Sequence, residues 1–151
     1  MLGVVLCGGR SMRFPHKLYL SSKKGICLPM EAVQMLKSVG LTQIKVCVNS
    51  QDNYFHSLFK YMKSVSLERD NYDGLPRLLE RLSSLDDLIV ICGDNVYGLT
   101  TMIETYKLLS QKSKRVMLAV NRTKSAIVNY MVGVVRMIDG LKKVGMMLHT
   151  L

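Results

Sequence analysis

The chain has 151 residues, of which 48% are hydrophobic and 21% are charged. This composition excludes a disordered or collagen-like chain, and the length allows one domain with a sizeable core but not two ordinary ones. The formal net charge of +10 at pH 7 suits a polyanionic ligand, either a nucleotide or a nucleic acid, and also helps to keep a protein in solution. We predict a single domain over residues 1–151, and charge alone does not identify its ligand.

The four cysteines are too widely spaced for a zinc motif or a small disulfide framework. Cys7, Cys47 and Cys92 lie inside apolar runs, where a thiol behaves as a small hydrophobic side chain, and this favours a reducing compartment. The sequence contains no run of about 18 consecutive apolar residues, so no membrane-spanning helix is predicted. We therefore expect a soluble, cytoplasmic protein without a membrane partner.

Short apolar runs alternate with segments of helical period in the first two thirds of the chain, which is typical of a parallel α/β sheet. The predicted strands cover residues 3–7, 43–49, 64–68 and 88–92. The predicted helices cover residues 28–39, 52–63, 75–85 and 100–112. Gly40 is placed to end the first helix, and leucines at helical spacing in the third helix predict a face packed on the core.

The hydrophobic pattern changes at residue 115. Residues 115–121, 128–138 and 141–148 are predicted strands, and the Asp-Gly pair at residues 139–140 is typical of a tight hairpin. The predicted fold class is α/β, a three-layer α/β/α domain with a mostly parallel, Rossmann-like sheet and a β-rich C-terminal end.

Two polar loops follow the two most apolar strands. "GGRSMRFPHK" begins at Gly8, and "GDN" contains Asp94. Right-handed crossovers bring the carboxyl ends of parallel strands to one edge of the sheet, where ligands bind in open α/β folds. We therefore expect Gly8, Gly9, Arg13, Lys17 and Asp94 to meet.

The residue types in these loops suit phosphate chemistry. Glycines let backbone N–H groups approach a triphosphate, Arg13 offers a two-pronged donor, and Lys17 a mobile point charge. A carboxylate such as Asp94 suits Mg²⁺ that is shared with substrate phosphates. The alternative is purely structural, because Asp and Asn after a strand often form turns or helix caps. The spacings exclude both the P-loop motif and the G-x-G-x-x-G motif.

Five segments together resemble a known family. The opening "GVVLCGGRSMRF…K" resembles L-A-G-G-x-G-T-R-L…K of the sugar nucleotidyltransferases, especially the glucose-1-phosphate thymidylyltransferases, within the wider GT-A-like nucleotidyltransferase superfamily. The resemblance continues in order through "KSVGLTQIKVCVN", "YDGL", "LIVICGDNVYG" and "VGVVRMIDG". It covers nearly the whole chain, and the ordered set is more specific than any one segment.

The resemblance implies an enzyme that transfers a nucleotidyl group from a nucleoside triphosphate to a sugar 1-phosphate and releases pyrophosphate, with Mg²⁺ as cofactor. It implies Arg13 and Lys17 as catalytic residues, Asp94 as the metal ligand and Gly133 as a sugar contact. The nucleotide-binding positions that it implies are Leu6, Gly8, Gly9, Arg10, Ser11 and Gly74.

The sequence also departs from this family. The loop between Arg13 and Lys17 is shorter than in the sugar enzymes and nearer in length to that of molybdenum-cofactor guanylyltransferases. Met12 stands where a small or hydroxylated residue is usual, and Ser21 replaces a proline. The sequence ends before an E-K-P motif and before the half that carries a second metal-binding aspartate. The resemblance therefore implies a member truncated at its C-terminal end, and three alternatives stay open: a minimal enzyme, a truncated remnant, or one part of a homo-oligomer that completes the site.

Two other functions remain open. A non-catalytic nucleotide-binding or interaction protein would keep the fold without turnover. A basic nucleic-acid-binding protein would use the net charge, but the 7% aromatic content and the absence of Trp disfavour a surface on which bases stack.

Overall fold

The computed structural model describes residues 1–8, 17–22, 24–49, 53–70, 77–78, 81–82, 88–94, 99–110, 116–120 and 144–148. These residues form a six-stranded sheet with the order β3-β2-β1-β4-β6-β5. The strands are β1 (Leu2–Leu6), β2 (Ile44–Asn49), β3 (Val65–Asp70), β4 (Leu88–Cys92), β5 (Val116–Val120) and β6 (Val144–Leu148). The helices are η1 (Lys17–Tyr19), α1 (Leu28–Ser38), α2 (Tyr54–Phe59) and α4 (Leu99–Ser110).

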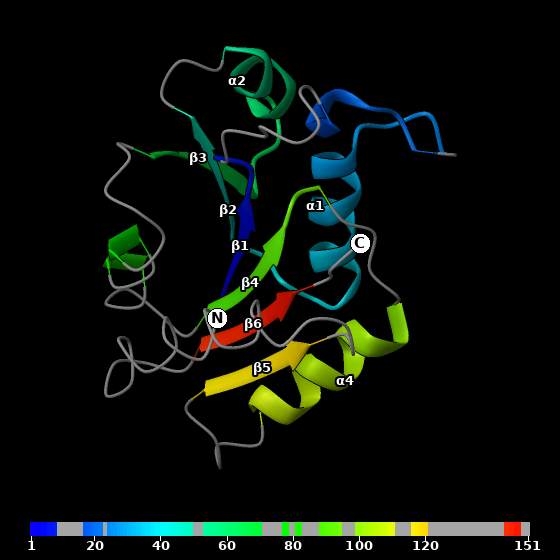
Figure 1. Cartoon of the computed structure of the whole chain (residues 1–151), viewed down its shortest axis with the longest axis vertical. Coiled ribbons are helices and arrows are strands. Elements are labelled where there is room, and N and C mark those ends of the chain that lie inside the picture. Colours follow the sequence, from blue (N-terminus) through cyan, green and yellow to red (C-terminus); the bar gives the residue numbers. More distant parts are fainter. Residues whose placement is uncertain are drawn as a thin grey trace.

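All neighbouring strands are parallel, and the strand order reverses at β1. After β1 the chain adds β2 and β3 on one side and then places β4 on the other side (Figure 1). At this reversal Leu6 is in register with both Cys47 and Cys92. An open α/β sheet offers its ligand site at such a point, just beyond the carboxyl ends of the strands.

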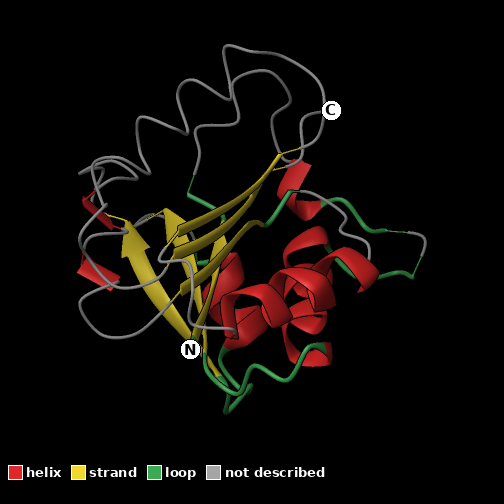
Figure 2. Cartoon of the chain, turned by 90° about the horizontal axis from the view of Figure 1, so that it is seen from below, coloured by secondary structure: helices red, strands yellow, loops and turns green. Residues whose placement is uncertain are grey.

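One face of the sheet carries the main core. Val5 of β1 is in register with Val46 and Ile91, and all three side chains are fully buried. Helices α1, α2 and α4 cover this face (Figure 2). Their side chains in the same cluster include Val33, Leu36, Phe55, Phe59 and Met102.

The opposite face of the sheet is also buried. Successive side chains of a strand point to opposite faces, so Val4 and Val90, which are in register, lie away from α1 and are fully buried. The helical residues Leu78 and Leu82 are buried as well, outside the cluster on the first face. Their segment lies on this second side of the sheet (Figure 2). Two faces covered by helices make the predicted three-layer α/β/α arrangement.

The described elements match the predicted ones closely, with differences at their ends. Of the helix predicted at residues 75–85, the structure describes residues 77–78 and 81–82, which are helical. Helix α1 ends where expected, because Gly40 takes a φ of 95° and its N–H donates to the Lys37 carbonyl at 2.9 Å. Helix α2 is shorter than predicted because β3 begins to pair with Ile44 at Val65, so the preceding residues are needed for a turn. No helix among the described residues is long and apolar enough to cross a membrane.

The two C-terminal strands complete the sheet on the β4 side. Strand β6 lies between β4 and β5 and runs parallel to both. Both β5 and β6 fall within predicted strands. The predicted strand at residues 128–138 and the Asp-Gly turn at residues 139–140 lie outside the described residues.

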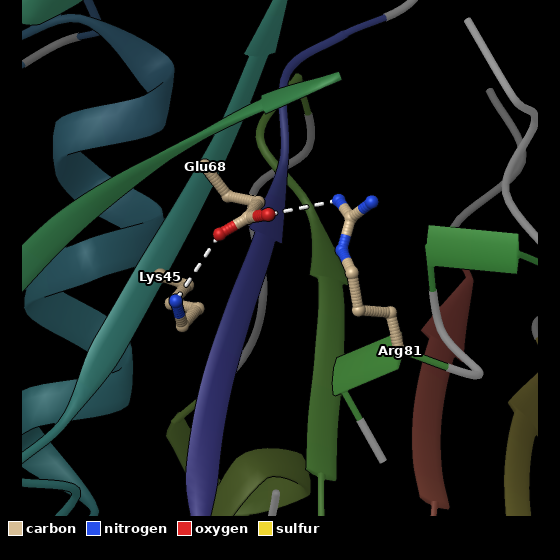
Figure 3. A network of polar contacts seen from close by, with 3 residues as sticks. All are labelled: Lys45, Glu68 and Arg81. Atoms are coloured by element: carbon tan, nitrogen blue, oxygen red, sulfur yellow. Dashed lines mark hydrogen bonds and ion pairs between the residues drawn. The ribbon is translucent and has the colours of Figure 1, made fainter. Parts of the chain in front are cut away.

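A polar network ties the second-face helical segment to the sheet (Figure 3). Glu68 of β3 accepts a hydrogen bond from Lys45 Nζ at 3.1 Å through Oε2, and one from Arg81 Nη2 at 2.8 Å through Oε1. Lys45 lies on β2, next to β3. One carboxylate therefore connects two strands and the segment that follows them in the chain.

We expect a double-mutant cycle with Glu68→Gln and Arg81→Gln to give a coupling free energy of about 0.5 kcal/mol. The Arg81 side chain is 45% exposed, and ion pairs at that exposure typically contribute about 0.2–1 kcal/mol. Urea unfolding of the four proteins measures the coupling. Arg77→Gln, an exposed arginine of the same segment, serves as the control for lost charge, and a Glu68–Arg81 coupling no larger than that of Glu68 with Arg77 would contradict the expectation.

Candidate functional site

The structure brings Lys17 and Asp94 together. Lys17 opens η1, Asp94 follows the end of β4, and Lys17 Nζ forms an ion pair with Asp94 Oδ2. The two side chains are 33% and 23% exposed, so both partners remain accessible from solvent. The expectation that the loops after β1 and β4 meet at one edge of the sheet is confirmed for these two residues.

Backbone hydrogen bonds hold the ends of three strands in line at this edge. The Gly93 N–H donates to the Leu6 carbonyl at 2.9 Å, and the Cys7 N–H donates to the Cys47 carbonyl at 2.7 Å. These bonds extend the parallel ladders beyond β1 and β4. As a result, Gly8 and Asp94 leave adjacent strands at the same level.

The approach of β4 to β1 requires glycine at position 93. A Cβ atom there would lie 2.5 Å from Cys7 Sγ, 3.1 Å from Val5 Cγ1 and 3.2 Å from the Leu6 carbonyl oxygen. Its φ lies outside the left-handed region, so the demand is for space and not for an unusual backbone conformation. Gly93 thus lets the chain that carries Asp94 lie directly against the end of β1.

Core packing anchors the segment that carries Lys17. Leu18 is buried in the main cluster, and the Leu20 N–H donates to the Lys17 carbonyl at 3.2 Å. The Tyr19 ring stacks on Phe55 of α2, with centroids 5.3 Å apart and planes 6° apart. The side chains that flank Lys17 therefore fix its backbone while its ammonium group reaches Asp94.

An aromatic group beside Lys17 was not predicted. Tyr19 meets Tyr54 edge to face, with centroids 4.9 Å apart, and both residues are partly exposed. They lie 35 positions apart in the sequence, and no motif links them. Only the packing of η1 against α2 makes them neighbours.

The other predicted site residues divide into two groups. Leu6 and Gly8 are described, and they lie at the end of β1 beside Gly93 and the Lys17–Asp94 pair. Six predicted residues lie outside the described ranges: Gly9, Arg10, Ser11, Arg13, Gly74 and Gly133. The roles assigned to all of these residues stay predictions.

The donor set decides which kind of metal site is chemically reasonable. The described part of the chain contains no group of three or more His, Cys, Asp or Glu side chains that could hold a metal ion. Within the described residues, the Asp94 carboxylate is the oxygen donor that the structure places beside Lys17. This fits Mg²⁺, which proteins commonly bind through one or two carboxylates together with substrate phosphates and water.

A buried thiol lies directly under the site. All four cysteines are reduced thiols, and burial raises the pKa of the Cys7 thiol well above its ordinary value, with smaller contributions from Cys47 and Asp94. A thiol that stays protonated is a poor nucleophile and metal ligand. Cys7 is therefore a packing residue of the site rather than a reactive one.

Comparison with known proteins supports the fold. No family model and no curated protein matches the sequence. Among solved structures, the chain is similar to a Bacillus anthracis protein assigned as a glucose-1-phosphate thymidylyltransferase and crystallised with sucrose, with a TM-score of 0.59 and 18% identity. The similarity covers 82% of this chain and 56% of that one, so the chain spans little more than half of its structural neighbour. The protein therefore shares a Rossmann-like α/β fold with this structure.

We expect Gly93→Ala to lower the free energy of unfolding by about 1–3 kcal/mol, the usual cost of overpacking. The added methyl group would collide with Cys7 Sγ and push the end of β4 away from β1. Thermal and urea unfolding measure the loss. In the double variant Cys7→Ala/Gly93→Ala the nearest clashing atom is absent. Gly93→Ala should therefore lower the free energy of unfolding less in the Cys7→Ala background than in the wild type. Strictly additive losses would contradict this packing.

The raised pKa of Cys7 predicts a loss of stability in alkali. Above about pH 8.5 the unfolded thiol ionises while the native thiol stays protonated, so the free energy of unfolding falls by up to about 1.4 kcal/mol per pH unit. Below that pH the contribution of this group is constant. Urea unfolding at neutral and alkaline pH should show a smaller fall for Cys7→Ala than for the wild type, and equal falls in the two proteins would refute the assignment.

Proposed function

We propose that this protein is a nucleotidyltransferase that joins a nucleoside triphosphate to a sugar 1-phosphate or a similar phosphorylated acceptor. The observation that carries the proposal is the meeting of Lys17 and Asp94 at the point where the strand order reverses. A cation for phosphates and a carboxylate for a metal thus lie where α/β folds bind their ligands. The similarity of the fold to an assigned sugar-phosphate thymidylyltransferase supports the same reaction class.

In this proposal the end of β1 holds the nucleotide. Backbone N–H groups of the glycine loop after Leu6 would face the phosphates, because glycine lets a ligand approach the main chain closely. Lys17 would place its ammonium group on phosphate oxygens, and Arg13 would add a two-pronged contact. The nucleobase would lie against Gly74 and the sugar against Gly133.

The reaction is an in-line displacement at phosphorus. An oxygen of the acceptor phosphate forms a bond to the α-phosphorus of the triphosphate. The bond from that phosphorus to the bridging oxygen of the β-phosphate breaks, and pyrophosphate leaves with the electron pair. Lys17 would stabilise the charge that develops on the phosphoryl oxygens. Bound Mg²⁺, held by Asp94 and the phosphates, would add positive charge at the same place.

The partners in this proposal are the nucleoside triphosphate, the phosphorylated acceptor and a second copy of this chain in a homo-oligomer. We also propose a cytoplasmic location, because the spacing of the four cysteines is not that of a small disulfide framework.

We expect Lys17→Ala and Asp94→Ala each to lower the rate of pyrophosphate release by at least about 10²-fold, a typical cost of removing one group that stabilises a developing charge. The assay supplies each nucleoside triphosphate with candidate sugar 1-phosphates and Mg²⁺, and it measures pyrophosphate with a coupled enzyme. Lys107→Ala, which changes an exposed lysine on α4, is the control for net charge and should keep the wild-type rate.

The melting temperature separates lost chemistry from lost fold. Both site variants should melt close to the wild type, because a partly exposed ion pair contributes little stability, typically about 0–1 kcal/mol. If nucleotides raise the melting temperature but no substrate pair yields pyrophosphate, the protein is a nucleotide-binding protein and not an enzyme. Strongly salt-dependent binding to nucleic acid that Asp94→Ala leaves unchanged would identify the basic surface as the functional one.

A further inference from the structure

The Lys17–Asp94 ion pair has a consequence for the order in which ligands can enter. We propose that Lys17 occupies Asp94 as an internal counter-ion, so that the site rejects a free divalent cation and accepts only a metal–nucleoside triphosphate complex. The inference rests on the proposed function, and it concerns how the two site residues control what binds.

The Lys17 ammonium group already occupies a cation position at Asp94. Lys17 Nζ contacts Asp94 Oδ2 directly, so the ammonium group stands where a cation would coordinate that oxygen. The backbone on both sides of the pair is fixed, by the buried Leu18 next to Lys17 and by the Gly93 N–H bond to Leu6 next to Asp94. The fold therefore holds the two backbone positions from which Lys17 and Asp94 reach each other.

The positive charge of Lys17 opposes a second cation at Asp94. A divalent cation that arrives alone must displace the ammonium group and then remain close to it, and like charges at short distance repel each other strongly where solvent is partly excluded. The described residues supply no further cluster of acidic or metal-binding side chains that would compensate. The ammonium group of Lys17 therefore weakens the binding of a bare divalent cation to Asp94.

The oxygens of a nucleoside triphosphate give the Lys17 ammonium group a new partner. When Lys17 moves from Asp94 to a phosphate, the carboxylate is released and binds the metal ion that the same nucleotide carries. Both exchanges replace one ion pair by another without leaving a charge unpaired. Metal and nucleotide therefore favour each other's binding through a single side chain, and by linkage this coupling is reciprocal.

The test uses Mn²⁺ as a spectroscopic probe of the metal site in the full chain. Electron paramagnetic resonance measures binding of Mn²⁺ alone to the wild type, Lys17→Gln and the charge control Lys107→Gln. We expect Lys17→Gln to bind Mn²⁺ at least about tenfold more tightly than the wild type, within the usual range of coupling between ligands. Lys107→Gln should behave as the wild type does, and the double variant Lys17→Gln/Asp94→Asn should lose the gain.

The results separate the inference from the proposed function. Equal Mn²⁺ affinity in the wild type and Lys17→Gln, or a gain that survives Asp94→Asn, would overturn the inference even if the protein releases pyrophosphate. A fluorescent, non-hydrolysable nucleoside triphosphate analogue gives the second readout, since the wild type should bind it more tightly with Mn²⁺ than with a chelator. If the wild type binds the analogue equally well in both conditions, selection of the metal complex is refuted. If the wild type binds no nucleotide at all, the proposed function fails, and the metal–nucleotide part of the inference fails with it. The Mn²⁺ measurement still decides whether Lys17 blocks the Asp94 carboxylate.

Discussion

The close contact between the ends of β1 and β4 is the constraint on which the site depends. Gly93 lies against Cys7 and donates its N–H to the Leu6 carbonyl, which leaves no room for a side chain at that position. Since β1 and β4 are neighbours in the sheet, no other strand separates their ends. Asp94 therefore emerges beside the start of the glycine loop, and Lys17 can reach it.

This arrangement explains why a packing residue matters to the chemistry of the edge. Cys7 belongs to the main core, and its thiol is kept protonated by burial. A protonated thiol of this size fills the space that Gly93 leaves open without adding a charge next to Asp94. Lys17 and Asp94 form the ion pair that the described residues show at this edge, and the Cys7 thiol beneath it is neutral.

Different contacts hold segments to the two faces of the sheet. On the first face, Leu18 and Phe55 attach the Lys17 segment to the core through burial and ring stacking. On the second face, Glu68 links β2, β3 and the helical segment that contains Arg81. Both faces bury apolar side chains, and this burial is not directional. The polar network adds a directional link between β3 and the segment of Arg81 on the second face.

The sequence alone determined the parallel α/β class, the approximate position of each described strand and helix, and the edge at which Lys17 and Asp94 meet. These follow from local periodicity and from the rule that parallel strands place their carboxyl ends on one side. The tertiary structure decided the placement of β6 between β4 and β5, the early end of α2, the Tyr19–Tyr54 contact, and the direct pairing of Lys17 with Asp94. Periodicity shows which face of an element is buried but not which distant segment covers it, so contacts between residues far apart in the chain were settled only when the elements packed together.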